Sequence, residues 1–271
     1  MAATLASLHV YPVKSCGGIE LGEARLDVTG LADDRRWMLV RPNGRFVTQR
    51  ELPRMALIHT AVSATGLSLS SPGRSTLEVA RAANGGALPV TVWKFHGSGF
   101  DCGDAAALWL SEYLETPLRL VTFDEAVPRT CSLEWTGDAT STTHFSDGFP
   151  VLVISRASLA DLNSRLPKAL PMNRFRPNIV LDGVDAYDED RIRELKVGGV
   201  VLRLVKPCIR CSITTTDQSV GALDGVEPLA TLKDFRFDKK LLGVAFGQNA
   251  IVIRGAGEHL RVGDEFEVAW K

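Results

Sequence analysis

A β-hairpin pattern between residues 194 and 208 is the feature that most constrains the fold of this chain. The segment reads ELKVGGVVLRLVKPC, and Gly198 and Gly199 separate its two arms. Paired glycines supply the backbone freedom that a tight hairpin turn requires. The second arm carries Val or Leu at most positions, as a strand buried on both faces does. The segment therefore predicts a core strand whose end delivers Cys208 and Cys211.

Strand signals recur along the rest of the chain and indicate a mostly β fold. Pro42-Asn43-Gly44 lies between two β-rich runs as a second hairpin turn. The C-terminal half resembles a small β-barrel with few helices. Further strands are predicted at residues 5–13, 23–30, 150–155, 178–183, 249–255 and 264–270.

Helices and irregular segments are fewer. An apolar stripe predicts a helix over residues 104–115. A second helix is expected at residues 158–166, opened by Ser158 with Asp161 three residues on as a capping box. Residues 125–145 are polar and lack any period, so we expect a long irregular or flexible connection there.

Charge and targeting signals exclude some classes of protein. The 271 residues carry 31 Lys and Arg against 32 Asp and Glu, so the net charge of -1 creates no overall attraction to nucleic acid or to a membrane surface. The N-terminus lacks the pattern of a secretion signal, and no apolar run reaches the length of a membrane span. We therefore expect a cytoplasmic protein without nucleic-acid or membrane partners. Its five cysteines, an odd number, are expected to remain thiols.

The segment KPCIRCSITTTD, from Lys206 to Asp217, has the densest set of reactive side chains. A CxxC pair fits a thioredoxin-like redox site, half of a zinc site, a soft-metal ligand or two buried thiols. The redox interpretation is disfavoured because a strand precedes Cys208 and a β-branched run follows Cys211. The zinc interpretation lacks a second pair of ligands. A soft-metal ligand and buried thiols both remain open.

Three other segments supply groups suited to an anionic ligand. They are Lys14-Ser15, Arg35-Arg36 and the run from Arg174 through Arg176 to Asn178. Arginine and lysine bind phosphate through charge and hydrogen-bond geometry, and turn segments add backbone amides. Taken singly, each of these basic residues is more often a surface charge or an ion-pair partner.

Together these segments resemble an ordered set of family motifs. The set is that of MOSC proteins with the MOSC N-terminal domain, among them the mitochondrial amidoxime-reducing component and its bacterial counterparts. The match covers nearly the whole chain, and its most specific motifs are CxRCxxTTxD and FRPN. The matching segments are YPVKSCGGIEL, DRRWMLV, FVTQRELPRM, SDGFPVLVISRASLADLNSRL, NRFRPNIVLDG, KPCIRCSITTTD and LLGVAFGQNAIV.

The resemblance implies a fold and its division into domains. The fold class is α+β and mostly β, with a MOSC β-barrel domain and a second, smaller α+β lobe. Residues 1–36 supply the first strands of the barrel, residues 37–122 form the MOSC N-terminal lobe, and residues 123–271 form the MOSC domain that binds the cofactor. The cofactor is then expected in the cleft between the lobes.

The resemblance also implies the molybdenum cofactor, Mo-molybdopterin, with one protein thiolate on the metal. The family's thiolate matches Cys211, and a cation beside it, Arg210, favours the deprotonated form. Asp147, the carboxylate of its motif, is the candidate proton donor and a second catalytic residue. The residues implied to hold the pterin and its phosphate are Lys14, Ser15, Arg35, Asp147, Gly148, Arg176, Asn178, Arg210 and Asn249.

The function implied is that of a molybdenum-dependent oxidoreductase. Its substrates are expected to be N-hydroxylated or N-oxide compounds such as amidoximes and hydroxylaminopurines. Some relatives append a ferredoxin domain with four clustered cysteines, whereas this sequence has no such cluster. An external donor is therefore expected, either a ferredoxin or a b-type cytochrome with its NADH-dependent reductase. The alternative is a non-catalytic carrier of the molybdenum cofactor or of sulfur.

Overall fold

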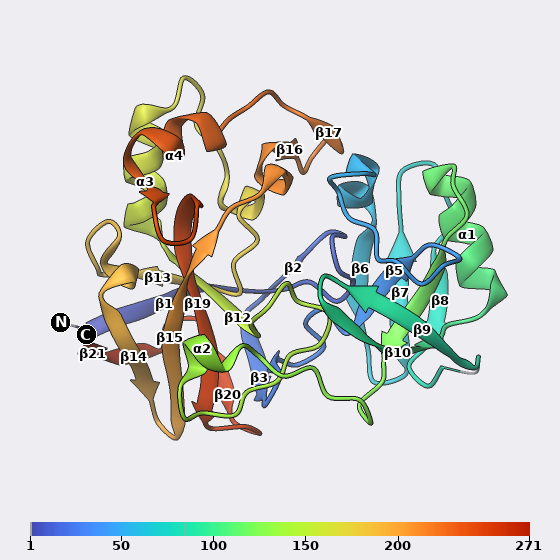
Figure 1. Cartoon of the computed structure of the whole chain (residues 1–271), viewed down its shortest axis with the longest axis horizontal. Coiled ribbons are helices and arrows are strands. Elements are labelled where there is room, and N and C mark those ends of the chain that lie inside the picture. Colours follow the sequence, from blue (N-terminus) through green and yellow to red (C-terminus); the bar gives the residue numbers. More distant parts are fainter. Residues whose placement is uncertain (1, 84) are drawn as a thin grey trace.

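A closed barrel beside a smaller lobe makes up the computed structural model, which describes residues 2–83 and 85–271 (Figure 1). Seven strands form the barrel, and pairing of β19 with β12 closes it. Closure removes the unpaired edges that an open sheet would expose. In spatial order the strands are β12 (Val151–Ser155), β13 (Ile179–Asp182), β1 (Ala2–Val10), β21 (Glu265–Trp270), β14 (Ile192–Val197), β15 (Val200–Ile209) and β19 (Gly243–Arg254).

The barrel interior is a continuous apolar core to which both ends of the chain contribute. Leu5 and Leu8 of β1 are fully buried there with Phe266 of β21. β1 pairs with β13 on one side and with β21 on the other, so the N-terminal strand lies within the barrel. Burial of such side chains supplies roughly 1.5–3 kcal/mol each. The first strand is thus held by packing and by two ladders of hydrogen bonds.

The smaller lobe contains two sheets and one long helix. One sheet has the order β5 (Trp37–Val40), β11 (Arg119–Phe123), β10 (Phe95–Asp101) and β9 (Ala87–Val92). The other consists of β6 (His59–Val62), β7 (Gly66–Ser70) and β8 (Leu77–Ala80). The helix is α1 (Asp104–Leu114), whose buried face packs with Trp37 in the core of this lobe. The lobe thus spans β5 to β11, while the domain limits at residues 36 and 122 remain a prediction.

Shorter elements connect and cover these two parts. Strand β2 (Ile19–Leu21) extends β1, and β18 (Phe237–Asp238) extends β19. The remaining strands are β3 (Glu23–Asp27), β4 (Gly30–Leu31), β20 (His259–Arg261), β16 (Thr216–Asp217) and β17 (Ala222–Leu223). The remaining helices are α2 (Leu133–Thr136), α3 (Arg156–Arg165), α4 (Leu229–Phe235) and the 3-10 helices η1 (Pro53–Leu57), η2 (Met172–Arg174), η3 (Asp188–Asp190) and η4 (Ser212–Thr215).

Several predicted elements are confirmed. The α+β class is confirmed as mostly β, since 41% of the chain is strand and 17% helix. The turn at Gly198 and Gly199 joins β14 to β15. Gly44 has a φ of +77° and donates its N–H to the carbonyl of Arg41 at 2.8 Å, as expected for the second hairpin turn.

The second predicted helix differs in its capping. Helix α3 begins at Arg156 rather than at Ser158. Its cap is Ser155, whose hydroxyl accepts a 3.0 Å hydrogen bond from the backbone N–H of Ser158. The expected capping box, with Ser158 as the cap and Asp161 as its partner, is therefore wrong. Ser155, three positions before Ser158, is the cap, and its hydroxyl satisfies the backbone N–H of Ser158 in the first turn of the helix.

Candidate functional site

One cavity of about 120 Å³ is lined by every site residue that was predicted from the sequence. It lies where the barrel meets loops that lead to the smaller lobe, and seven separate segments of the chain line it. The predicted residues on its wall are Lys14, Ser15, Arg35, Asp147, Gly148, Arg176, Asn178, Arg210, Cys211 and Asn249. Cys208, the first thiol of the CxxC pair, also lines the cavity. The sequence did not single out the other lining residues, which are Thr48, Ser146, Phe149, Leu152, Phe175, Ile209 and Ile213.

Arg176 and Arg35 stack on one aromatic ring at the cavity wall. Their guanidinium carbons lie 4.2 Å and 4.4 Å from the ring centroid of Tyr11. Arg35 donates hydrogen bonds to Asp34 at 2.5 Å and to Asn178 at 3.0 Å. Arg176 is buried in a left-handed conformation with a φ of +55°, and its Nη2 has no partner among the described residues. Burial lowers the pKa of Arg176 to about 10, so it stays charged at neutral pH.

The CIRC segment presents one thiol at the end of β15 and one just beyond it. Arg210 donates from Nη1 to the sulfur of Cys208 at 2.9 Å and from Nη2 to the carbonyl of Phe175 at 2.6 Å. Its Nε is buried without a partner in the described chain. Burial raises the pKa of Cys208 although Arg210 opposes this. Cys211, half-buried at the N-cap of η4, lines the cavity without a side-chain hydrogen bond at the cap.

Lys14 and Asp147 form a salt bridge across the cavity wall. Nζ of Lys14 donates to Oδ1 of Asp147 at 2.6 Å and to the carbonyl of Phe145 at 2.7 Å. The indole N–H of Trp93, from the β9–β10 hairpin of the smaller lobe, donates to the same carboxylate at 3.1 Å. Desolvation acts to raise the pKa of Asp147, but Lys14 and Trp93 hold it below its usual range. Asp147 is therefore ionised at neutral pH.

Arg129 fixes the backbone that carries Asp147. This buried guanidinium donates to the carbonyls of His144 at 3.1 Å, Asp147 at 2.8 Å and also Ser146. Arg129 comes from the stretch 125–145, which was expected to be irregular but contains the short helix α2 and several buried side chains. Its role was missed because an arginine that binds only carbonyls leaves no pattern in the sequence.

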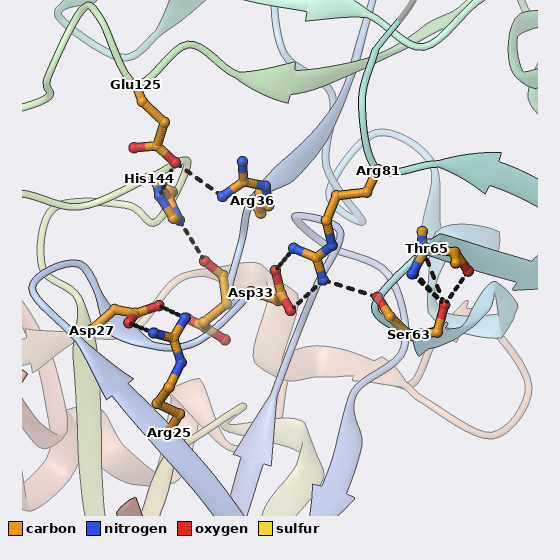
Figure 2. A network of polar contacts seen from close by, with 11 residues as sticks. Arg25, Asp27, Asp33, Arg36, Ser63, Thr65, Arg81, Glu125 and His144 are labelled. Atoms are coloured by element: carbon orange, nitrogen blue, oxygen red, sulfur yellow. Dashed lines mark hydrogen bonds and ion pairs between the residues drawn. The ribbon is translucent and has the colours of Figure 1, made fainter. Parts of the chain in front are cut away.

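A polar network surrounds the turn next to Arg35 (Figure 2). Arg81, just after β8, makes a two-pronged ion pair with Asp33 at 2.7 Å and 2.8 Å. In the same view, Glu125 accepts from Arg36 at 3.0 Å and lies 3.1 Å from His144. Asp33 and Arg36 flank Arg35 in sequence, so these contacts anchor the turn that carries Arg35 to both lobes.

The donor set of the cavity fits an anionic group held beside a soft ligand. Arg176 and Arg210 each leave one buried N–H without a partner among the described residues, and an unmade hydrogen bond of a buried donor costs about 1–3 kcal/mol. A phosphate or other anion is the kind of acceptor that such guanidinium groups bind. The thiol of Cys211 supplies the kind of ligand that soft metals prefer.

Comparison with known families agrees with this fold. The MOSC N-terminal beta barrel domain matches residues 2–117, and the MOSC domain matches residues 140–267. The molecule is thus a two-domain MOSC protein. The YUAD protein from Bacillus subtilis has a TM-score of 0.43 to this structure at 12% identity, over 100% of this chain and 97% of that one.

Curated relatives are more similar. The chain is 38% identical to mitochondrial amidoxime-reducing component 1 of Homo sapiens, over 96% of this chain and 81% of that protein. It is 36% identical to mitochondrial amidoxime reducing component 2 of Bos taurus, over 86% of this chain and 72% of that protein. The chain belongs to the MOSC family that includes these amidoxime-reducing components.

The expected cytoplasmic location is contradicted by these relatives, whose names describe them as mitochondrial. The expectation rested on the missing secretion signal. A missing secretion signal does not exclude a mitochondrial location, because transit peptides of organelles are amphipathic and lack the apolar stretch of a secretion signal. Within the part of the chain that the structure describes, no helix is long and apolar enough to cross a membrane.

Proposed function

We propose that this protein is a molybdenum-cofactor-dependent reductase of N-hydroxylated or N-oxide compounds. The observation that carries the proposal is the convergence of ten family-matched residues on the wall of one cavity, among them two arginines that each have a buried N–H without a partner in the described chain. The names of the relatives, amidoxime-reducing components, support the same class of reaction.

The residues of the cavity divide into a metal ligand and an anion-binding wall. Cys211 is proposed to hold molybdenum as a thiolate. The unpartnered N–H groups of Arg176 and Arg210 are proposed to bind the pterin and its phosphate. The remaining proposed contacts come from Lys14, Ser15, Arg35, Gly148, Asn178 and Asn249. When bound, the cofactor supplies the two-electron chemistry that removes oxygen from nitrogen.

Protons for the reaction are proposed to pass through the pair of Lys14 and Asp147. Reduction of an N–OH group to an amine and water consumes two electrons and two protons. Asp147 was the expected proton donor, but Lys14 keeps it ionised, so the proton of the pair resides on Nζ of Lys14. Burial lowers the pKa of Lys14, although Asp147 opposes this, and makes it a better acid than a lysine in water. Asp147 positions that ammonium group.

Electrons are proposed to come from a separate redox protein, either a ferredoxin or a b-type cytochrome. The test combines molybdenum and pterin content per chain with reduction of benzamidoxime by reduced viologen. Stoichiometric cofactor with turnover supports the reductase. A loaded protein that reduces no amidoxime or hydroxylaminopurine supports the carrier alternative, and protein from a competent host that contains no molybdenum overturns both.

A further inference from the structure

Two lysines lie against one indole ring outside the lining of the cavity but near Phe149, which lines it. The ring centroid of Trp135, on α2, is 5.1 Å from Nζ of Lys206 and 5.1 Å from Nζ of Lys240. Both distances fall within the range of cation–π interactions. Trp135 and Lys206 are half-buried, and Lys240 is exposed. The ring thus holds two positive charges near each other.

Neither ammonium group is neutralised by the protein. Within residues 2–83 and 85–271, no carboxylate forms an ion pair with Lys206 or Lys240. Arg203, the other cation in this part of β15, is paired with Glu194 at 3.1 Å and with Asp138 at 3.4 Å. Strand β15 therefore carries Arg203, whose charge is paired with carboxylates of the protein, and Lys206, whose charge is available to a ligand.

This pair of lysines lies next to the cavity. Nζ of Lys206 is 6.0 Å from the ring centroid of Phe149, which lines the cavity. On the adjacent strand, Asn249 also lines the cavity, pairs in register with Lys206 and donates to its carbonyl at 3.3 Å. A ligand that reaches the cavity over Phe149 therefore passes within reach of Lys206.

We infer that Lys206 and Lys240, held over Trp135, form a subsite for an anionic tail of the substrate. The inference rests on the proposed reductase function and specifies its substrate class: a planar N-hydroxylated compound that carries a phosphate or carboxylate. The planar end packs against Phe149 and places its N–OH group in the cavity. The two ammonium groups bind the anion in the solvent-exposed rim.

The test compares a neutral substrate with its charged counterpart. Hydroxylaminopurine riboside and its monophosphate are reduced by the intact loaded protein with reduced viologen, and kcat/KM is measured for both. The variants are Lys206→Gln, Lys240→Gln and the double variant. Lys239→Gln is the matched control, because Lys239 is exposed beside Lys240 but contacts no aromatic ring in the described chain.

The wild type is expected to favour the monophosphate. Each single substitution should lower the ratio of the two kcat/KM values about 2- to 5-fold, as is typical of partly exposed charge pairs. The double substitution should remove most of the preference, and the control should retain it. A ratio that is the same in the wild type and the double variant overturns the subsite.

A binding measurement separates this inference from the proposed function. Calorimetric titration with adenosine monophosphate and with adenosine needs no turnover. If neither N-hydroxylated compound is reduced, the reductase proposal fails, and a preference for the monophosphate that the double variant loses still supports the subsite. If the substitutions slow turnover only with a protein donor and not with viologen, the lysines bind that donor and the subsite is wrong.

Discussion

Lys14 and Asp147, 133 residues apart in the chain, are joined by a 2.6 Å hydrogen bond between Nζ and Oδ1. Lys14 follows the first barrel strand, and Asp147 precedes β12. Trp93 adds a bond to the same carboxylate from the tip of a hairpin in the smaller lobe. This one interaction therefore links the barrel, the irregular segment and the smaller lobe at the wall of the cavity.

The first prediction concerns the pH dependence of turnover in Asp147→Asn. Burial lowers the pKa of Lys14, and the charge of Asp147 opposes that effect. Without the carboxylate, the pKa of Lys14 falls further, and the ammonium loses its proton at a lower pH. The alkaline limb of the kcat profile should therefore move to lower pH in the viologen-linked assay. Asp161→Asn, which removes a carboxylate paired with Arg165 on α3, should leave the profile unchanged.

A second prediction distinguishes the two thiols of CIRC. Cys211→Ser should lose activity and molybdenum outright, because an alkoxide is a poor substitute for a soft thiolate. Cys208→Ser should retain much of both, since a hydroxyl can still accept the hydrogen bond from Arg210. Metal analysis and benzamidoxime reduction check both variants. Equal activity in the two would refute the assignment of Cys211 as the metal ligand.

A third prediction contrasts two buried arginines of the NRFRPN segment. Arg176→Ala should lower cofactor occupancy more than thermal stability, because Arg176 lines the cavity. Arg174→Ala should do the reverse, because Arg174 lies outside the cavity lining and is paired with Asp217 at 3.2 Å and Asp224 at 2.6 Å. We expect this loss to cost about 1–3 kcal/mol of stability. Pterin extraction and thermal melting measure the two effects; a collapse of Tm with unchanged pterin in Arg176→Ala would make that residue structural.

Arg129 provides a fourth prediction, about positioning. In Arg129→Gln, the shorter amide side chain cannot donate to all three carbonyls that Arg129 binds. The backbone of residues 144–147 should therefore become more mobile and displace Asp147. Because Asp147 positions the ammonium group of Lys14, that group would be misplaced too, and misplacement of a catalytic group lowers kcat/KM on the order of 10- to 100-fold. Amide hydrogen exchange should accelerate in residues 144–147 before it does so in β12. Wild-type exchange there, together with wild-type kinetics, would show that Arg129 does not position the loop.

The sequence predicted more of the residues that line the cavity than of the residues that hold them in position. Cys211 and Arg176 were identified because family motifs place them, and the structure brings their segments to one cavity. Arg129 and Trp93 were not identified from the sequence. Arg129 binds backbone carbonyls, and Trp93 binds the carboxylate of Asp147, which only the folded chain brings near it. The barrel strands were readable from alternating and buried runs. The closure of the barrel by pairing of β12 with β19 could not be predicted, since strands so far apart in the sequence give no local signal of their pairing.

The last prediction is that NADH alone will not sustain turnover, whereas NADH with a ferredoxin or b-type cytochrome and its reductase will. A nicotinamide site would need a strand, a G-x-G-x-x-G turn and a helix within roughly thirty residues. One of the three glycine pairs of this chain, at residues 198 and 199, instead forms a β-hairpin turn.

The proposed molybdenum centre can then be reduced only by a partner that docks transiently. The decisive measurement is NADH oxidation by the purified chain freed of flavoproteins, with benzamidoxime present. Steady oxidation matched by benzamidine formation would reveal a second cofactor site and overturn the requirement for a separate electron donor.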